Sequence, residues 1–269
     1  MVEKSPFKWI FLFLSALVLL FIIAPLAGMF IHTGAKEFFE TAADKEVHSS
    51  IWLTLWVSFT GTFIFAIGGV PLAWLLARKK FHGKSIVQGI IDLPVVLPHT
   101  AAGIALLGFI SRDGILGKTA SVFGLNLVNH PGGIAIAMAF VSLPFLINSA
   151  RDGFASVPER LEKAALNLGA SQARVFFTIS LPLAWRSIIS GFVMMFARGM
   201  SEFGAVVIIA YHPMVAPVLI YERFSSFGLN YARPAAVLFI LVALIVFISL
   251  RLLSIRRREK PFARDAEAY

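Results

Sequence analysis

The chain has 269 residues, of which 58% are apolar and 14% are charged, and its formal net charge is +9. This balance excludes an ordinary water-soluble domain, in which about a quarter of the residues are charged. The sequence also contains no cysteine, which excludes disulfide bonds, iron–sulfur clusters and thiolate metal sites.

Six long apolar runs are separated by more polar segments. Each run is close to or longer than the roughly 20 residues that an α-helix needs to cross about 30 Å of hydrocarbon. The sequence therefore predicts an all-α, polytopic transmembrane bundle, with one transmembrane domain over residues 1–260 and a tail over residues 261–269. The predicted spans are 9–31, 51–77, 86–110, 131–150, 188–211 and 234–255, and residues 151–187 form the longest loop between them.

Positive charge is unevenly distributed among the predicted loops. Most of the 24 lysines and arginines lie in the N-terminal tail, residues 78–85, residues 151–187 and the C-terminal tail. Because lysine and arginine favour the cytoplasmic side of short membrane loops, we expect both termini and the loop 151–187 in the cytoplasm. This topology also accounts for the net charge without a nucleic-acid partner.

Pro94 and Pro98 lie in the third predicted span. Each proline removes a backbone donor and clashes with the carbonyl one turn earlier, so we expect this helix to bend. Inside a membrane, neighbouring helices or a water-filled cavity must satisfy the freed carbonyls. Two interpretations remain open: a kink that serves packing, and a helix that lines a translocation pathway.

The ionisable side chains deepest in the predicted spans are Asp92, His99, Arg198 and Glu202. Arg198 and Glu202 are spaced one helical turn apart in the fifth span. An isolated charge at the centre of a membrane helix costs about 2.5–3.5 kcal/mol, so a mutual pair facing the bundle interior is the expected arrangement. One interpretation is a structural ion pair. The other is that these residues, with His99 and the two prolines, belong to the pathway of a transported ion or to its gate.

One short motif resembles a nucleotide-binding loop. Gly83-Lys84-Ser85 matches the end of the phosphate-binding pattern, but Arg78 stands where that pattern requires its first glycine. We therefore expect a transport subunit without its own ATPase site, and no cofactor bound to this chain. The six histidines are dispersed along the sequence and indicate no metal site.

The loop 151–187 has a clear helical pattern of its own. Ser156 and Glu159 have the spacing of a capping box, and Gly169 stands where a helix ends in a left-handed residue. Ser171 can start a second short helix, which we expect to end at Leu181-Pro182 before the fifth span. The first helix has an apolar stripe made of Val157, Leu161, Ala164, Ala165 and Leu168.

The stripe on this first helix could face either of two surfaces. An amphipathic helix can lie in the plane of the inner leaflet. The face at Ala164 and Ala165 offers little apolar area to lipid, however, and acidic and basic side chains alternate around it. We therefore favour docking to a protein and keep the membrane surface as the alternative.

The same loop resembles the EAA loop of ABC-importer permeases, whose pattern is Glu-Ala-Ala-x3-Gly-x9-Ile-x-Leu-Pro. The spacing agrees throughout, except that Lys163 stands at the glutamate position and Glu162 comes one residue earlier. The resemblance implies that the loop transmits motion from an ATPase subunit to the spans. The residues implied in this coupling are Glu159, Arg160, Glu162, Lys163, Ala164, Ala165, Gly169, Leu181 and Pro182.

Other segments resemble the branch of this family that carries oxyanions. Residues 92–100 and 196–205 are similar to sulfate, molybdate and tungstate permeases, and residues 210–217 and 220–223 are most similar to archaeal-type molybdate/tungstate permeases. The resemblance implies a type I importer in the cell membrane, in which a homodimer with six helices per subunit has its pathway on the two-fold axis. It also implies two cytoplasmic ATPase subunits that bind ATP and Mg²⁺, and an extracytoplasmic oxyanion-binding protein.

Three alternatives to a molybdate/tungstate importer remain at this stage. The first is a permease for sulfate or another oxyanion. The second is a stand-alone secondary transporter, for which inverted repeats or coupled acidic residues in the spans are expected; we find no internal repeat. The third is a membrane enzyme, which needs a nucleophile, an acid and a base that converge on one point.

Overall fold

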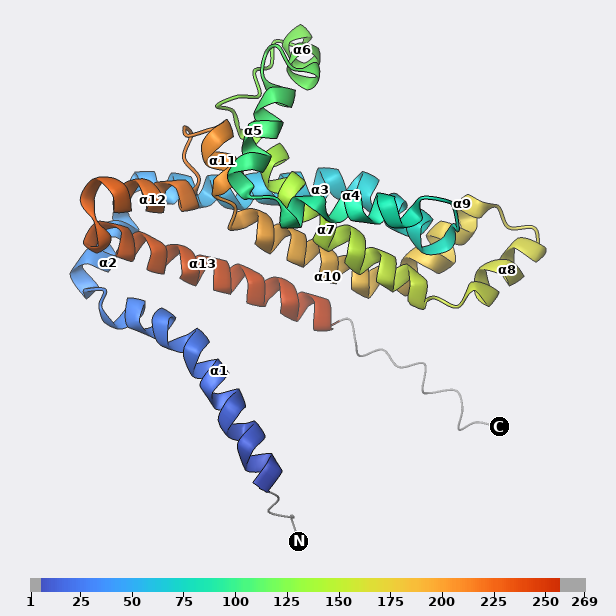
Figure 1. Cartoon of the computed structure of the whole chain (residues 1–269), viewed down its shortest axis with the longest axis horizontal. Helices are drawn as coiled ribbons and strands as arrows, with labels where there is room; N and C mark the ends of the chain where they lie inside the picture. The colour runs from blue at the N-terminus through green and yellow to red at the C-terminus, as the bar shows by residue number, and fades with distance from the viewer. Residues whose placement is uncertain (1–5, 257–269) are drawn as a thin grey trace.

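The computed structural model describes residues 6–256, which form helices joined by turns, with no strand in that range (Figure 1). Five helical segments are long and apolar enough to cross a membrane, and a bent pair of helices makes a sixth when it is counted as one span. The predicted all-α membrane bundle is therefore confirmed. The helices are α1 (Pro6–Ile31), α2 (Ala35–Ala43), α3 (Lys45–Arg78), α4 (Lys84–Val96), α5 (His99–Ile110), α6 (Ile115–Val122), α7 (Pro131–Ser156), α8 (Glu159–Asn167), α9 (Gln172–Val175), the π-helical η1 (Phe176–Ser180), α10 (Leu181–Met200), α11 (Gly204–Ile209), α12 (Ala216–Phe227) and α13 (Leu229–Arg256).

The centre of the bundle is α7, which packs between α3 and α10 (Figure 1). Small residues let the helices approach closely, as is common in membrane proteins. A Cβ atom on Gly153 of α7 would lie 2.4 Å from Cβ of Ser187 in α10, a distance that real structures do not allow. Ser149 Oγ donates a hydrogen bond to the Ser187 carbonyl at 2.7 Å. The α7–α10 contact therefore depends on glycine and on a hydrogen bond between the two helices.

The two ends of the bundle have different elements. Helices α8 and α9 lie at one end, and α2 and the turn between α12 and α13 lie at the other (Figure 1). Helix α1 has no buried residue in its most apolar stretch and diverges from α13, while α5 and α6 project sideways from the long axis (Figure 1). These elements leave large apolar surfaces uncovered by the chain itself. Residues 257–269, which include the predicted C-terminal tail (261–269), lie outside the described residues.

The third predicted span is broken, not simply kinked. Helices α4 and α5 are bent by 111° relative to each other at a break of two residues. Leu97 has an extended backbone conformation, and Pro98 is the N-cap of α5, whereas Pro94 lies buried inside α4. A proline at the N-cap is compatible with a helix start, because the first amides of a helix have no intrahelical partner. The expected bend is thus confirmed at Pro98, and its size exceeds an ordinary proline kink.

The fifth predicted span differs from the expectation at both ends. It starts earlier, because α9, η1 and α10 form one continuous apolar segment from Gln172 to Met200. It also ends earlier, since a turn over residues 201–203 separates α10 from the short α11. The prediction that Leu181-Pro182 ends a helix is therefore wrong. One π-type bond, from the Leu181 amide to the Phe176 carbonyl, carries the helix past the proline, which has no amide proton to donate.

Candidate functional site

The short helix α8, at one end of the bundle, is the element predicted to couple this chain to a partner. The predicted stop is confirmed: Gly169 has φ of +87°, and the Gly169 and Ala170 amides bond to the Leu166 and Ala165 carbonyls at 2.9 and 3.0 Å. These two bonds form a Schellman motif, which favours glycine because its left-handed residue carries no Cβ penalty. The predicted capping box is wrong, because Ser156 lies in the last turn of α7, where its hydroxyl donates to the Gly153 carbonyl.

Glu162 attaches α8 to its own subunit. Its carboxylate accepts bonds from Arg78 Nε and Nη2 at 2.8–3.0 Å and from Ser180 Oγ at 2.6 Å. The Arg78 and Glu162 side chains are 8% and 11% exposed, and Arg78 Nη2 also donates to the Val157 carbonyl. This site joins the end of α3, the start of α8 and the segment before α10. The resemblance implied that Glu162 takes part in coupling to a partner, and the structure shows its carboxylate bound within its own chain.

The outer face of α8 is apolar at its centre and charged at its margin. Leu161, Ala164 and Leu168 are exposed, so most of the predicted stripe has no partner within the described chain, whereas Val157 is buried in the core. Lys163 Nζ lies 2.9 Å from Glu159 Oε2 on the same helix. The hydrogen bond from Lys163 lowers the pKa of Glu159 below its usual value. This surface has the composition expected of a protein-docking face.

The other predicted residues of this loop lie close by, and most of them are exposed. Arg160 and Gly169 are exposed, Ala165 and Leu181 are partly buried, and Pro182 is exposed. Leu181 packs against the core cluster that contains Leu76 of α3 and Phe154 of α7. Leu181 and Pro182 therefore belong to the base of the fifth span, not to the docking face.

Phe176 fixes the segment after α8 to the bundle. Its ring packs edge-on against Trp74 of α3 at a centroid distance of 5.5 Å, and it lies 6.0 Å from the ring of Phe154 in α7. Between this contact and α8 is a cavity of about 170 Å³, lined by Trp74, Arg78, Glu162 and neighbouring side chains. Within the described residues, the buried indole N–H of Trp74 has no hydrogen-bond partner. Aromatic packing and the Arg78–Glu162 pair thus hold α8 and α9 to the same part of α3.

The second candidate site lies where both helix breaks meet. The predicted pair is confirmed: Arg198 Nη2 lies 3.1 Å from Glu202 Oε2. His99, the first residue of α5, joins the pair, with Nδ1 2.8 Å from Glu202 Oε2 and both ring nitrogens 2.9 Å from Arg198 Nη2. The structure therefore brings together three of the four ionisable residues that the sequence placed inside the spans. We call these three residues the His99–Arg198–Glu202 cluster.

Close backbone packing between α5 and α11 sets the geometry of this cluster. A Cβ on Gly204 would lie 2.7 Å from His99 Cβ, and a Cβ on Gly103 would lie 2.9 Å from Ala205 Cα. Glu202 Oε1 also accepts a hydrogen bond from the Ala205 amide at 2.9 Å, which caps the start of α11. Gly103 and Gly204 were not identified as site residues from the sequence. Their positions close to His99 and Glu202 in the chain could have indicated them.

Asp92, the fourth ionisable residue, lies apart from this cluster. Its carboxylate accepts a hydrogen bond from the Asn148 amide group of α7 at 2.6 Å. The bond joins α4 to the central helix and gives the carboxylate a partner inside the bundle. Asp92 is therefore a contact between helices and not a fourth member of the cluster.

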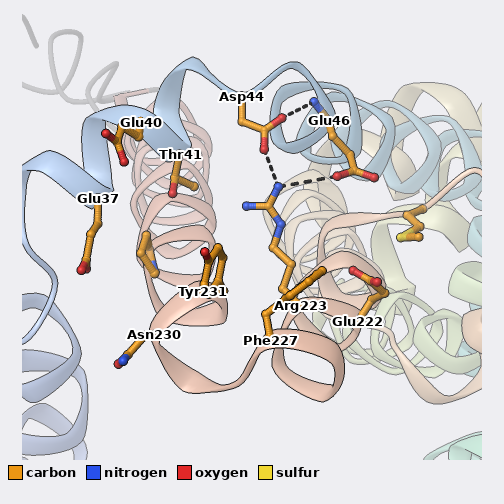
Figure 2. Close-up of a pocket in the computed structure, with 12 residues that line it drawn as sticks. Glu37, Glu40, Thr41, Asp44, Glu46, Glu222, Arg223, Phe227, Asn230 and Tyr231 are labelled. Carbon is orange, nitrogen blue, oxygen red and sulfur yellow. Dashed lines mark hydrogen bonds and ion pairs between the residues drawn. The ribbon is translucent and has the colours of Figure 1, made fainter.

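At the opposite end of the bundle from α8 is a cavity of about 800 Å³ with a predominantly acidic lining. Figure 2 shows Arg223 of α12 reaching between Asp44 and Glu46 at the start of α3, and Glu37, Glu40 and Glu222 around the same space. Burial raises the pKa of Asp44, but the hydrogen bonds from Arg223 and the Glu46 amide outweigh this, so the pKa lies below its usual value. The cavity is not apparent in the sequence, because Asp44 and Arg223 in its walls are 179 residues apart in the chain.

Metal binding is not supported within the described residues, where no group of three or more histidine or acidic side chains is placed to hold a metal ion. The carboxylates around the acidic cavity are spread along its walls, and Arg223 occupies the space between two of them (Figure 2).

Comparison with known proteins agrees with this geometry. The family described as "Binding-protein-dependent transport system inner membrane component" matches residues 69–259. The chain is 44% identical to the molybdate/tungstate transport system permease protein of Pyrococcus furiosus, over 95% of this chain and 98% of that protein. It is 35% identical to a probable sulfate transport system permease protein of Chlorokybus atmophyticus, over 71% and 68% of the two chains.

The fold also has a solved counterpart. A chain from the crystal structure of a bacterial ABC transporter involved in the import of the acidic polysaccharide alginate matches with a TM-score of 0.73 at 19% identity, over 94% of this chain and 96% of that chain. The predicted fold class, family and membrane location are therefore confirmed. The chain belongs to the family of binding-protein-dependent transport system inner membrane components.

Proposed function

We propose that this chain is the membrane-spanning permease subunit of an ABC importer that carries molybdate or tungstate into the cell. The observation that carries the proposal is the 44% identity to a molybdate/tungstate permease, which extends over 95% of the chain. The chain supplies the pathway and no ATPase site. ATP and Mg²⁺ are bound by two separate ATPase subunits on the cytoplasmic side, and an extracytoplasmic binding protein delivers the anion.

Coupling to the ATPase goes through α8. Its exposed face at Leu161, Ala164 and Leu168 docks in the partner, while Glu162 and Phe176 transmit the partner's movement to α3 and α7. This arrangement suits mechanical coupling, because an ion pair that is almost fully buried and an aromatic contact resist local bending. ATP must bind one conformation of the assembly better than the other for transport to follow.

The working unit is a homodimer with both termini in the cytoplasm. The uneven distribution of lysine and arginine supports this orientation, which places α8 inside and the acidic cavity outside. The uncovered α1 and the projecting α5–α6 segment support a second copy, since Ile115 and Phe123 of that segment are each 76% exposed. A contiguous apolar surface of this kind marks contact with lipid or protein.

A sulfate permease is the second candidate, and the similarity to a probable sulfate permease favours it over other anions. Selectivity in either case resides mainly in the binding protein, since a pathway that binds an ion tightly cannot release it quickly. No conventional specificity pocket is therefore required of this chain.

The test is ATP-dependent uptake into liposomes that contain this chain, its ATPase and its binding protein. We expect uptake of molybdate and tungstate that requires all three components and stops without ATP. Uptake of sulfate alone would assign the second candidate. Uptake by this chain without the ATPase would contradict the proposal and indicate a stand-alone transporter.

A further inference from the structure

We propose that the His99–Arg198–Glu202 cluster is a weak binding site for a tetrahedral oxyanion in the translocation pathway. In this site Arg198 contacts the anion, and Glu202 and His99 hold the arginine in place. This inference rests on the proposed transport function and adds to it the residue of this chain that touches the anion.

Glu202 is the fixed part of the site. Its side chain is 0% exposed, and both of its oxygens already have partners: Oε1 accepts from the Ala205 amide, and Oε2 contacts His99 and Arg198. A buried carboxylate with all these contacts cannot turn toward a ligand without losing them. Glu202 is therefore a positioning residue.

Arg198 has hydrogen-bonding capacity that the cluster does not use. Only Nη2 contacts His99 and Glu202, and Nη1 makes a single long contact of 3.3 Å to Ser201 Oγ. Between residues 7 and 252 the structure places no acceptor on Arg198 Nε. The guanidinium group has parallel N–H donors that match the oxygen spacing of tetrahedral oxyanions, and part of this edge remains available.

The available edge faces away from the bundle core. The Arg198 and His99 side chains are 25% and 34% exposed in the single chain. A charged group exposed to lipid at membrane depth is costly, so this edge faces either water or another protein chain. In the proposed dimer both possibilities place it at or beside the pathway.

The surrounding backbone supports the same location. Two helix breaks meet at the cluster: the bend between α4 and α5, which interrupts a span, and the turn that ends the span of α10 before the short α11. Irregular backbone at membrane depth is tolerated where it is buried in protein or lines a water-filled cavity, and such breaks accompany substrate sites in transporters. A purely structural ion pair would not require two breaks or an exposed third member.

The charges explain why this site binds weakly. Glu202 offsets the charge of Arg198, so this pair has no net charge and attracts the anion mainly through directed N–H groups. A weak site lets the anion pass, whereas an unbalanced positive charge would retain it. Removing the negative charge of Glu202 should therefore strengthen binding of the anion. If the pair had only a structural role, its loss would have the opposite effect.

The first experiment uses the double variant Arg198→Gln/Glu202→Gln. A single Arg198→Ala change would leave the buried Glu202 without its main partner and impair assembly, whereas the double variant removes both charges and retains hydrogen-bonding groups. The matched control is Arg151→Gln/Asp152→Asn, which removes an ion pair of 3.0 Å near the end of α7, outside the three sites described above. We measure the yield of the permease–ATPase complex, the uptake rate and the number of molybdate ions transported per ATP.

We expect the double variant to assemble with a yield within about twofold of wild type. Uptake and ions transported per ATP should both fall at least tenfold, while the control stays within about twofold on each measure. Uptake by the double variant within twofold of wild type would overturn the inference. Arg198 and Glu202 would then have only a structural role. If the wild-type complex transports no oxyanion at all, it is the proposed function that fails.

The second experiment measures binding directly and does not depend on transport. Radiolabelled molybdate is dialysed against the purified permease–ATPase complex without binding protein, for wild type and for the single variant Glu202→Gln. We expect Glu202→Gln to bind molybdate at least tenfold more tightly than wild type, and the tighter binding to disappear when Arg198→Gln is added. Equal or weaker binding by Glu202→Gln would contradict the inference, even if the double variant of the first experiment fails to assemble.

Discussion

Arg78 at the end of α3 and Glu162 in the second turn of α8 form an almost fully buried ion pair in which both Nε and Nη2 of the arginine contact the carboxylate. The pair connects a membrane span to the helix that is proposed to meet the ATPase. Ser180 Oγ also donates to the Glu162 carboxylate, which adds a third group to the contact between α8 and the rest of its own chain.

We predict that Glu162→Ala uncouples the transporter. Removing one partner of a buried ion pair leaves the other charge unpaired and costs about 3–5 kcal/mol. We expect a lower melting temperature for the complex and a loss of uptake that exceeds the loss of ATP hydrolysis. Lys163→Ala, which breaks the exposed neighbouring pair with Glu159, is the control and should leave the melting temperature unchanged. Equal effects of the two variants would contradict the prediction.

The Schellman turn after α8 gives a second prediction. Gly169→Ala should destabilise this turn by about 1–2 kcal/mol, because an L-residue is strained at φ of +87° even though the site has space for a methyl group. Faster amide hydrogen exchange over residues 159–170 is the measurement. Gly68→Ala, in the middle of α3 with open space around it and ordinary φ, should show no such change. Unchanged exchange in Gly169→Ala would show that the turn is not under this constraint.

The packing of α7 against α10 gives a third prediction. Gly153→Ala places a methyl group 2.4 Å from Ser187 Cβ, which forces the helices apart and costs about 1–3 kcal/mol. We expect a lower yield of folded protein and a lower melting temperature in detergent. Gly108→Ala on α5, where nothing lies within 4 Å, should behave as wild type. A normal melting temperature for Gly153→Ala would mean that the two helices can separate at little cost.

The acidic cavity gives a prediction about pH. Burial raises the pKa of Asp44, but its bonds with Arg223 and the Glu46 amide outweigh this effect, so the pKa lies below its ordinary value. A carboxyl group with a lowered pKa in the folded state stabilises the protein above its unfolded pKa, and this contribution is lost as the pH falls through the folded pKa. Wild type should therefore melt at a higher temperature than Asp44→Asn at pH 6, and the difference should shrink as the pH falls below about 4. A difference that stays constant down to the acid limit of the fold would contradict this assignment.

The sequence was sufficient to predict features that depend on residues close together in the chain. Hydrocarbon thickness imposes long apolar helices, so the centres of the spans were predicted, and the left-handed turn at Gly169 was predicted because few residues other than glycine favour it. Arg198 and Glu202 were paired correctly because they are four residues apart, although Glu202 lies in the turn just after α10. In each case the relevant partner is nearby in the chain.

Features that depend on distant residues were missed. The burial of Glu162 was not predicted because its partner Arg78 is 84 residues away, and nothing local distinguishes a buried carboxylate from an exposed one. The size of the break at Pro98 follows from the packing of α5 on α11, which proline alone does not determine. Helices α3 and α10 both start before the predicted apolar runs, since polar first turns do not register as membrane spans.

The central claim is that ATP drives transport through α8, and the absence of native cysteine allows a direct test. Ala164→Cys, on the exposed face of α8, and Lys118→Cys, on α6, each introduce the only thiol of the chain. Each reconstituted complex is assembled from permease that has been treated with a bulky maleimide. We predict that ATP-dependent molybdate uptake falls at least tenfold for labelled Ala164→Cys and stays near wild type for labelled Lys118→Cys. Full uptake by labelled Ala164→Cys would contradict the account.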